Sequence, residues 1–371
     1  MIRAATSDDV DRVAAVVVEE PIGWIDAERF RADYAERMYR PEWTWIAERD
    51  GRIVARALWW GLSDSTHPLA LDCLSVDPSV PDRAALATEL LTAGMSAFDA
   101  PVAPQFNVSL TAGWRDDPAT VAAIEWRRAA AHAVGLTDEV ERLRFEWTPD
   151  PAGTPDPAGT PDPAGAPDSV GTPDPVGVPD SVGVPDMAGA ADAGTSGESA
   201  GSTAPAGVAV SGSGGRLVFK EAGDEEFFEV FRRVAQGSLD AQTRRNVALD
   251  GVDATARSEM DFYLGCPGER SWWRIATTPA GELVGLAVPS ATPYHRNVGY
   301  LGVVPEMRGR GHVDEILAEI TRFHAADGAQ VITATTDAAN APMAAAFSRA
   351  GYRTTEIRMV YTAPPVAVAD S

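Results

Sequence analysis

The stretch VGYLGVVPEMRGRGHVDEILAEITRFHAADG, residues 298–328, decides the fold of this chain. Its first part predicts a strand that ends at Pro305, and a turn containing glycines follows. After the turn, positions at helical spacing mark one face of a helix: Val313, Ile316, Leu317, Ile320 and His324. Strand, tight turn and helix in this order are the expected surroundings of a bound phosphate, because a helix N-terminus presents unpaired N–H groups and partial positive charge.

The turn itself carries residues suited to phosphate binding. Gly309 and Gly311 let backbone amides point inward toward a pyrophosphate, and Arg308 and Arg310 can supply full positive charge. His312 lies in the same turn, where it either contacts a phosphate or faces solvent. We therefore predict a pyrophosphate site here.

At these residues the sequence resembles a known family. The pattern Val-x-Pro-x-x-Arg-Gly-x-Gly at residues 303–311 is similar to the coenzyme A-binding motif of the GNAT superfamily, whose core is Gln/Arg-x-x-Gly-x-Gly/Ala. Arg308 and Gly311 match that core, whereas Val313 stands where the superfamily has Gly or Ala. Residues 340–352 resemble the superfamily's Asn-x-x-Ala-x-x-Leu-Tyr-x-x-x-Gly-Phe segment, which contacts the pantetheine side of the coenzyme.

The resemblance implies a fold, a co-substrate and a set of binding residues. The fold is α/β, a mixed and splayed sheet flanked by helices, and the co-substrate is acetyl-CoA. The backbone near Val303 and Val304 would hold pantetheine and face the thioester oxygen. The implied coenzyme A contacts are Gly302, Val303, Val304, Arg308, Gly309, Arg310, Gly311, His312, Val313, Asn340 and Phe347.

The catalytic acid and base are less clear from the same resemblance. Phe347 replaces the superfamily's tyrosine, so another group or water must protonate the departing thiolate. Tyr300, His295 and Asp337 are the candidates, since they lie on or beside the strands expected near the acetyl group. His295 is also explained as a solvated loop residue, and Asp337 as the cap of a helix that begins near Asn340.

The two halves of the chain resemble each other. Residues 43–60 and 272–290 each predict a hairpin, and each hairpin precedes a strand ending near a proline, then helix, strand, helix and strand. We infer two α/β domains from a duplication, the alternative being that unrelated α/β domains share such elements. In the first half the corresponding turn, residues 78–85, has no glycine and contains Pro81, which predicts that it does not hold coenzyme A in the usual way.

Between the halves lies a repeat of six residues. Seven units from PDPAGT to PDMAGA begin at Pro149, and an Ala-, Gly- and Ser-rich tract follows. A hexapeptide β-helix is the structured alternative, but a proline starts every unit and only Ala or Val could face inward. The predicted organisation is a degenerate GNAT-like domain at 1–148, a disordered linker at 149–215, an N-acetyltransferase domain at 216–364 and a flexible tail at 365–371.

Composition narrows the partners. The net charge is −23 without a basic segment, which disfavours nucleic acid. No apolar run is long enough for a membrane span, and no signal peptide is recognisable, so we expect a cytoplasmic protein. The only two cysteines, Cys73 and Cys266, lack metal-ligand spacing, and we expect no metal.

The predicted function is transfer of an acetyl group from acetyl-CoA to an amine-bearing small molecule or peptide, by direct attack in a ternary complex. Two alternatives stay open: a regulatory pseudoenzyme that binds acyl-CoA without turnover, and an enzyme that acetylates protein amines. The first half would shape the acceptor cleft or a homodimer, and a second copy of the chain is the other partner considered.

Overall fold

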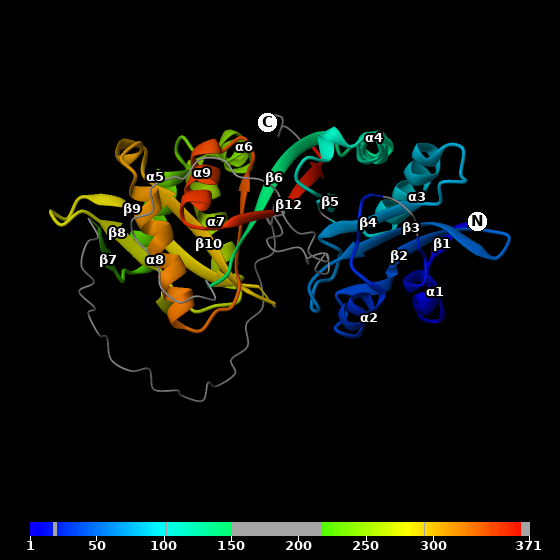
Figure 1. Cartoon of the computed structure of the whole chain (residues 1–371), viewed down its shortest axis with the longest axis horizontal. Coiled ribbons are helices and arrows are strands. Elements are labelled where there is room, and N and C mark those ends of the chain that lie inside the picture. Colours follow the sequence, from blue (N-terminus) through cyan, green and yellow to red (C-terminus); the bar gives the residue numbers. More distant parts are fainter. Residues whose placement is uncertain (18–20, 101, 150–216, 293, 365–371) are drawn as a thin grey trace, which may run out of the picture.

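The computed structural model describes residues 1–17, 21–100, 102–149, 217–292 and 294–364 (Figure 1). The hexad segment after Pro149 and the C-terminal tail lie outside the described residues. Within these ranges, both halves of the chain form α/β structure, as the sequence predicts.

The strands of the described residues form one mixed sheet in the order β1-β2-β3-β4-β5-β12-β6-β11-β10-β9-β8-β7. The first half contributes β1 (Ile2–Ala4), β2 (Tyr39–Arg49), β3 (Arg52–Trp60), β4 (Ala70–Val76), β5 (Gln105–Leu110) and β6 (Asp138–Trp147). The second half contributes β7 (Val218–Lys220), β8 (Arg274–Thr277), β9 (Leu283–Ala291), β10 (Arg296–Val303), β11 (Ile332–Asp337) and β12 (Arg353–Thr362).

Helices cover the sheet in both halves (Figure 1). They are α1 (Val10–Ala14), α2 (Ala27–Ala35), α3 (Arg83–Ala97), α4 (Pro118–Ala133), α5 (Asp224–Ala235), α6 (Ala241–Asp250), α7 (Val252–Gly265), α8 (His312–Ala326) and α9 (Ala341–Arg349). The orders β2-β3-β4-α3-β5-α4-β6 and β8-β9-β10-α8-β11-α9-β12 are the same, so the predicted repetition of elements is confirmed.

The first predicted hairpin shows how local sequence sets these elements. Asp50 and Gly51 both adopt positive φ angles, 51° and 75°, between the paired strands β2 and β3. Two central residues with positive φ match the right-handed twist of a hairpin, and an Asp-Gly pair adopts that conformation at little cost. The second hairpin is formed by β8 and β9.

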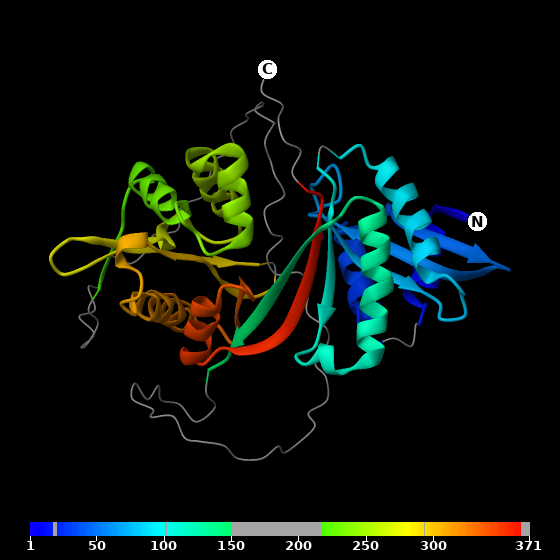
Figure 2. The same cartoon turned by 90° about the horizontal axis from the view of Figure 1, so that it is seen from above.

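The last strand of each half lies in the sheet beyond its own half. β6 is hydrogen-bonded between β11 and β12, and β12 is hydrogen-bonded between β5 and β6. Figures 1 and 2 show β6 and β12 side by side at the centre of the molecule. The halves have therefore exchanged strands, an arrangement that the sequence boundaries of the two predicted domains do not convey.

The buried side chains follow the exchange. Phe145 of β6 is buried in the hydrophobic core of the second half, where its ring stacks on Phe347 at a centroid distance of 4.8 Å. Conversely, Ile357, Met359 and Tyr361 of β12 belong to the core that α3 and α4 cover in the first half. Each half thus completes its core with a strand of the other.

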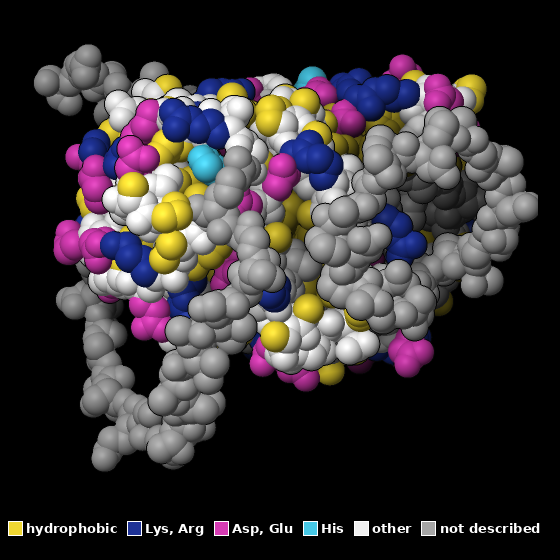
Figure 3. Space-filling model, turned by 60° about the vertical axis from the view of Figure 1, so that its left-hand side comes forward, with side chains coloured by type: hydrophobic (Ala, Val, Ile, Leu, Met, Phe, Trp, Pro, Cys, Tyr) yellow, Lys and Arg dark blue, Asp and Glu magenta, His cyan; other side chains and the backbone are white. Residues whose placement is uncertain are grey.

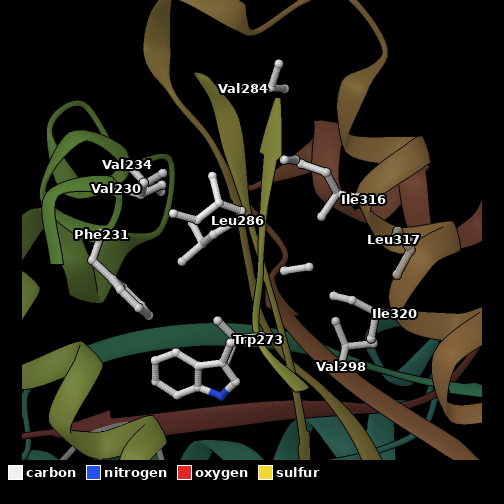
Figure 4. Close-up of a cluster of buried hydrophobic side chains, with 14 of the residues drawn as sticks. Val230, Phe231, Val234, Trp273, Val284, Leu286, Val298, Ile316, Leu317 and Ile320 are labelled. Atoms are coloured by element: carbon white, nitrogen blue, oxygen red, sulfur yellow. The ribbon is translucent and has the colours of Figure 1, made fainter. Parts of the chain in front are cut away.

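In the second half, the sheet is packed between helices on both faces. Figure 4 shows Phe231 and Val234 of α5 on one side of β9, and Ile316 and Ile320 of α8 on the other. All four side chains are nearly inaccessible to solvent. This sandwich fixes β9 and β10 between two rigid layers, so that the end of β10 presents its turn in a defined position.

On the face that Figure 3 shows, acidic and basic side chains are interspersed. No described helix is both long and apolar enough to cross a membrane. Among the residues with described positions, no group of three or more His, Cys, Asp and Glu side chains could hold a metal ion.

Candidate active site

The sheet splits open where β10 and β11 diverge. These strands pair in parallel only at Arg296 and Asn297, opposite Ile332 and Thr333. An irregularity in β10 follows, where Gly299 has a φ of 66° and a side chain would place its Cβ 2.2 Å from the Val288 carbonyl oxygen. Beyond this point a cleft of about 410 Å³ lies between the strands, the phosphate turn and helices α6 and α7.

The backbone of β10 presents unpaired groups to this cleft. The amide of Val304 donates to Val284 on β9 at 2.9 Å. Because successive residues of a strand point their amides to opposite sides, the amides of Val303 and Leu301 point away from β9, toward the split. The predicted contact of Val303 with coenzyme A therefore remains a proposal. Val304 is fully buried and its amide is occupied, so it is not placed to face a thioester.

The predicted phosphate turn has the expected backbone geometry. Gly309 and Gly311 have φ angles of 73° and 79°, in the left-handed region that favours glycine, and α8 begins at His312. Within the described residues, the amides of Gly309 and Gly311 donate no hydrogen bond. Unpaired amides at a helix N-terminus suit a pyrophosphate, so these residues fit the diphosphate of coenzyme A.

The two arginines of the turn have different roles from those predicted. The guanidinium of Arg308 donates to three carbonyl oxygens, those of Val303, Val234 and Gly237. Arg308 therefore fastens the end of α5 to the turn, with one hydrogen bond from each of its three guanidinium nitrogens. Arg310 donates to the Glu306 carbonyl and does not line the cleft.

The other predicted coenzyme contacts surround the turn. Gly302, His312, Val313, Asn340 and Phe347 all line the cleft. The His312 side chain is mostly buried, and its Nδ1 has no hydrogen-bond partner among the described residues. Phe347 is held by its stacking on Phe145 and offers no hydroxyl, so the acid must come from elsewhere.

A buried carboxyl lies on the side of the cleft formed by α6 and α7. Glu259 of α7 is 6% exposed and accepts a hydrogen bond of 2.7 Å from the Thr243 hydroxyl at Oε1. Its Oε2 has no partner among the described residues. Burial raises the pKa of the Glu259 carboxyl to about 7, which suits a general base at neutral pH.

Two tyrosines flank this carboxyl. Tyr300 of β10 packs against Tyr263 of α7, with ring centroids 5.6 Å apart, and both line the cleft. The Tyr263 hydroxyl donates to the Gly299 carbonyl at 3.3 Å. Burial, and then the nearby Glu259 carboxylate, raise the pKa of Tyr300 well above its ordinary value, so its hydroxyl stays protonated. Tyr300 is thus the one predicted catalytic residue that lies in the cleft.

The other two catalytic candidates lie outside the cleft lining. His295 is exposed in the hairpin between β9 and β10, where its amide donates to Thr292, so it is corrected from catalytic candidate to surface residue. Asp337 is 1% exposed at the end of β11. Its carboxylate accepts from the Ala241 amide at 2.6 Å and so caps α6, rather than the helix after Asn340.

Sequence reasoning missed Glu259 although a signal was present. The stripe that α7 buries comprises Thr255, Ala256, Glu259 and Met260, and an acidic residue at such a position is unusual. Nothing local connects that position with β10, some forty residues later in the chain, so only the folded chain shows that the two share a cleft.

In the corresponding turn of the first half, two aspartates accept from three of the amides. Asp77 accepts from the amides of Ser79 and Val80, and the Asp82 carboxylate caps α3 through the Ala85 amide. Proline at positions 78 and 81 removes two further donors. This geometry supports the prediction that the first half does not hold coenzyme A through its turn.

The second half combines a split sheet with a glycine turn at a helix N-terminus. Residues 244–352 match the model of the acetyltransferase (GNAT) family. The matched range contains Glu259, Tyr300, the phosphate turn and α9.

Solved structures with similar architecture have low sequence identity. A GCN5-related N-acetyltransferase from Sphaerobacter thermophilus is 15% identical with a TM-score of 0.47, and the match covers 99% of this chain and 97% of that one. A tandem GNAT protein from the clavulanic acid biosynthesis pathway is 14% identical with a TM-score of 0.37, covering 98% and 90%. No curated protein sequence matches the chain.

Proposed function

We propose that the protein transfers an acetyl group from acetyl-CoA to the amine of a small molecule or peptide, within a ternary complex. One observation carries the proposal: a single cleft joins unpaired amides of a phosphate turn to a buried carboxyl with an unpaired oxygen. Acetyl-CoA would supply the acyl group as a thioester, with its diphosphate at residues 309–313.

In this proposal the residues of the chain align the reactants and move protons. Glu259 accepts a proton from the substrate ammonium at Oε2, which leaves a neutral amine nitrogen. A C–N bond then forms as the C–S bond breaks, and the amide of Val303 donates to the carbonyl oxygen while it carries negative charge. The second proton of the nitrogen passes to the sulfur of the departing thiolate.

Tyr300 is the proposed route for that second proton. Its hydroxyl stays protonated at neutral pH, and the side chain lines the cleft beside Glu259. It would donate its proton to the thiolate and take up the surplus proton of the positively charged nitrogen, which leaves a neutral amide. Tyr300 of β10 would then act as the general acid, because Phe347 has no hydroxyl.

A sensor that binds acyl-CoA without turnover is the second candidate, and the loss of a hydroxyl at Phe347 favours it. The full-length protein would be titrated calorimetrically with coenzyme A and acetyl-CoA, and thiol release would be followed with a panel of amines. Binding together with amine-dependent thiol release supports the enzyme. Binding without release from any amine supports the sensor, and absence of binding contradicts both.

A further inference from the structure

One charged side chain of the cleft comes from the first half of the chain. Arg142 lies on the exchanged strand β6, directly opposite Asp337 on β11, and it lines the cleft together with Glu259 and Tyr300. Its side chain is 17% exposed. The strand exchange therefore delivers a guanidinium to a cleft whose remaining lining residues all belong to the second half.

The guanidinium of Arg142 is paired through Nε, and its two terminal nitrogens are available. Its Nε lies 3.4 Å from Oδ1 of Asp337, whose Oδ2 accepts from the Ala241 amide. The two terminal nitrogens donate to none of the described residues, and unlike Nε they are not buried. Asp337 thus orients the arginine and leaves its terminal nitrogens available.

The acidic groups around Arg142 differ in what they leave open. Asp240 caps α6 by accepting from the Thr243 amide at 2.8 Å. Asp337 is engaged by Ala241 and Arg142, and burial followed by the proximity of Asp240 raises its pKa to about 6. Glu259 alone lines the cleft with a buried carboxyl oxygen that has no partner among the described residues. Besides the groups of the phosphate turn, the cleft therefore offers an unpaired acceptor at Glu259 and an unpaired pair of donors at Arg142.

We infer that Arg142 binds a carboxylate of the acceptor, whose amine lies at Glu259; this rests on the proposed function. The acceptor class is then an amino acid, or a compound bearing an amine and a carboxylate on one small skeleton. A planar guanidinium with two free terminal nitrogens pairs with a carboxylate through two parallel hydrogen bonds. A purely cationic amine would leave that guanidinium unpaired and repelled.

The test compares matched acceptors on the full-length protein. Glycine, β-alanine, γ-aminobutyrate, lysine and glutamate would be assayed beside alkylamines and diamines of the same carbon skeleton without the carboxylate. Arg142→Gln removes the charge and Arg142→Lys keeps it without the planar geometry. Arg115→Gln is the matched control, because Arg115 pairs with Glu141, the neighbour of Arg142 on β6, and lies outside the cleft lining.

We expect the wild type to prefer at least one carboxylate-bearing amine over its matched amine. Arg142→Gln should raise KM for that acceptor about tenfold or more, while kcat changes less than about threefold and KM for the matched amine does not rise. Arg142→Lys should fall in between, and Arg115→Gln should change neither. An equal effect of Arg142→Gln on both acceptor classes, or a wild-type preference for amines without carboxylate, overturns the inference.

Calorimetric binding of the same amines to protein loaded with coenzyme A separates the two levels of the proposal. If no amine is acetylated but carboxylate-bearing amines bind wild type and not Arg142→Gln, the proposed function fails and the inference about Arg142 stands. If acetylation occurs without selectivity for carboxylate-bearing amines, the proposed function stands and the inference about Arg142 fails. If Arg142→Gln does not fold, the KM ratio between matched acceptors in Arg142→Lys decides, and an unchanged ratio overturns the inference.

Discussion

The sheet opens once in each half, and the two openings differ in what they offer a ligand. In the second half β10 and β11 pair in parallel over two residues, and in the first half β4 and β5 do the same at Ala70 and Leu71. Both openings hold a cleft, of about 410 Å³ in the second half and about 320 Å³ in the first. The shape of the sheet is thus common to both, and it cannot by itself decide which half binds a coenzyme.

The two halves differ in the hydrogen bonding of the turn beside each cleft. The turn before α8 leaves the amides of Gly309 and Gly311 unpaired within the described residues. In the turn before α3, the amides of Ser79, Val80 and Ala85 donate to Asp77 and Asp82, whose carboxylates both lie there. Anionic side chains at a helix N-terminus take the place that a phosphate would occupy. The two halves thus share the scaffold, and the turn suited to a phosphate lies in the second half.

The buried acids of the two clefts differ in a related way. Asp72 in the first half lies near the Tyr39 hydroxyl at 3.2 Å and the Asn107 amide at 3.4 Å, one at each carboxylate oxygen. Glu259 in the second half has one oxygen bonded and one open. Burial raises both pKa values, to about 6 for Asp72 and about 7 for Glu259, but only Glu259 keeps an oxygen for a substrate.

The largest expected effect comes from separating the halves. Residues 1–149 expressed alone would lack β12, and residues 217–371 alone would lack β6, so each loses a strand from the middle of the sheet and part of its core. We expect neither fragment to unfold cooperatively by circular dichroism. Mixed or co-expressed, the two should form a one-to-one complex in size-exclusion chromatography and recover coenzyme A binding.

A full-length chain with a protease site inserted between residues 150 and 216 is the control. After cleavage the halves should stay associated through β6 and β12. Independent folding of both fragments, with separation after cleavage, would contradict the strand exchange.

Glu259→Gln should reduce kcat/KM by about 10² to 10³ while leaving coenzyme A affinity unchanged, because it removes the proton acceptor and keeps the shape. In the wild type, kcat/KM should rise with pH to a plateau above a pKa of about 7, since the ionised carboxylate is the active form. Steady-state kinetics between pH 5.5 and 8.5 measure both. Glu315→Gln, in the first turn of α8 and outside the cleft lining, is a control for loss of charge nearby. An unchanged pH profile in Glu259→Gln would mean that Glu259 is not the general base.

The same substitution should stabilise the protein at high pH. The Glu259 pKa is about 7 in the folded protein against the ordinary 4.5 of a glutamate, so the folded state binds its proton more tightly. Stability from this group is therefore present at acidic pH and decreases as pH rises from 4.5 through 7, by about 3 kcal/mol in total. Thermal unfolding should show Glu259→Gln more stable than wild type at pH 8 and nearly equal at pH 4.5. Equal stability at both pH values would argue against a raised pKa.

Gly311→Trp should weaken coenzyme A binding about tenfold or more, because the left-handed backbone at the helix N-terminus is strained by any side chain and the indole blocks the amides. Gly328→Trp is the matched control, since Gly328 has a φ of 84° at the other end of α8 and nothing within 4 Å of an added Cβ. Calorimetry with coenzyme A compares the two at equal fold stability. Similar losses in both variants would mean that strain, and not the turn, lowers affinity.

The sequence predicts the features that depend on neighbouring residues. The pair Asp50-Gly51 predicts the first hairpin, and Gly309 with Gly311 predicts the turn before α8, because φ preferences act within a few residues. The exchange of β6 and β12 could not be predicted, since strand periodicity says which face is buried and not which strand lies alongside. Arg142 is unpredictable for the same reason: Asp337, its partner, lies almost two hundred residues away.

The smallest expected effect tests whether the first cleft takes part in acyl transfer at all. Asp72→Asn replaces a carboxyl whose two oxygens already have partners, and acidic residues accept from the amides of Ser79 and Ala85 in the turn of its half. We therefore expect kcat/KM for the acyl transfer to change less than about twofold, in contrast with Glu259→Gln. Kinetics on both variants, at the same pH and with thermal unfolding to confirm the fold, measure the contrast.

Because Arg358 of β12 acts on the pKa of Asp72, as Arg142 of β6 does on that of Asp337, each exchanged strand brings an arginine toward the other half. A large loss of activity in a folded Asp72→Asn variant would mean that this pair of strands couples the two clefts, and that the first half acts on the chemistry of the second.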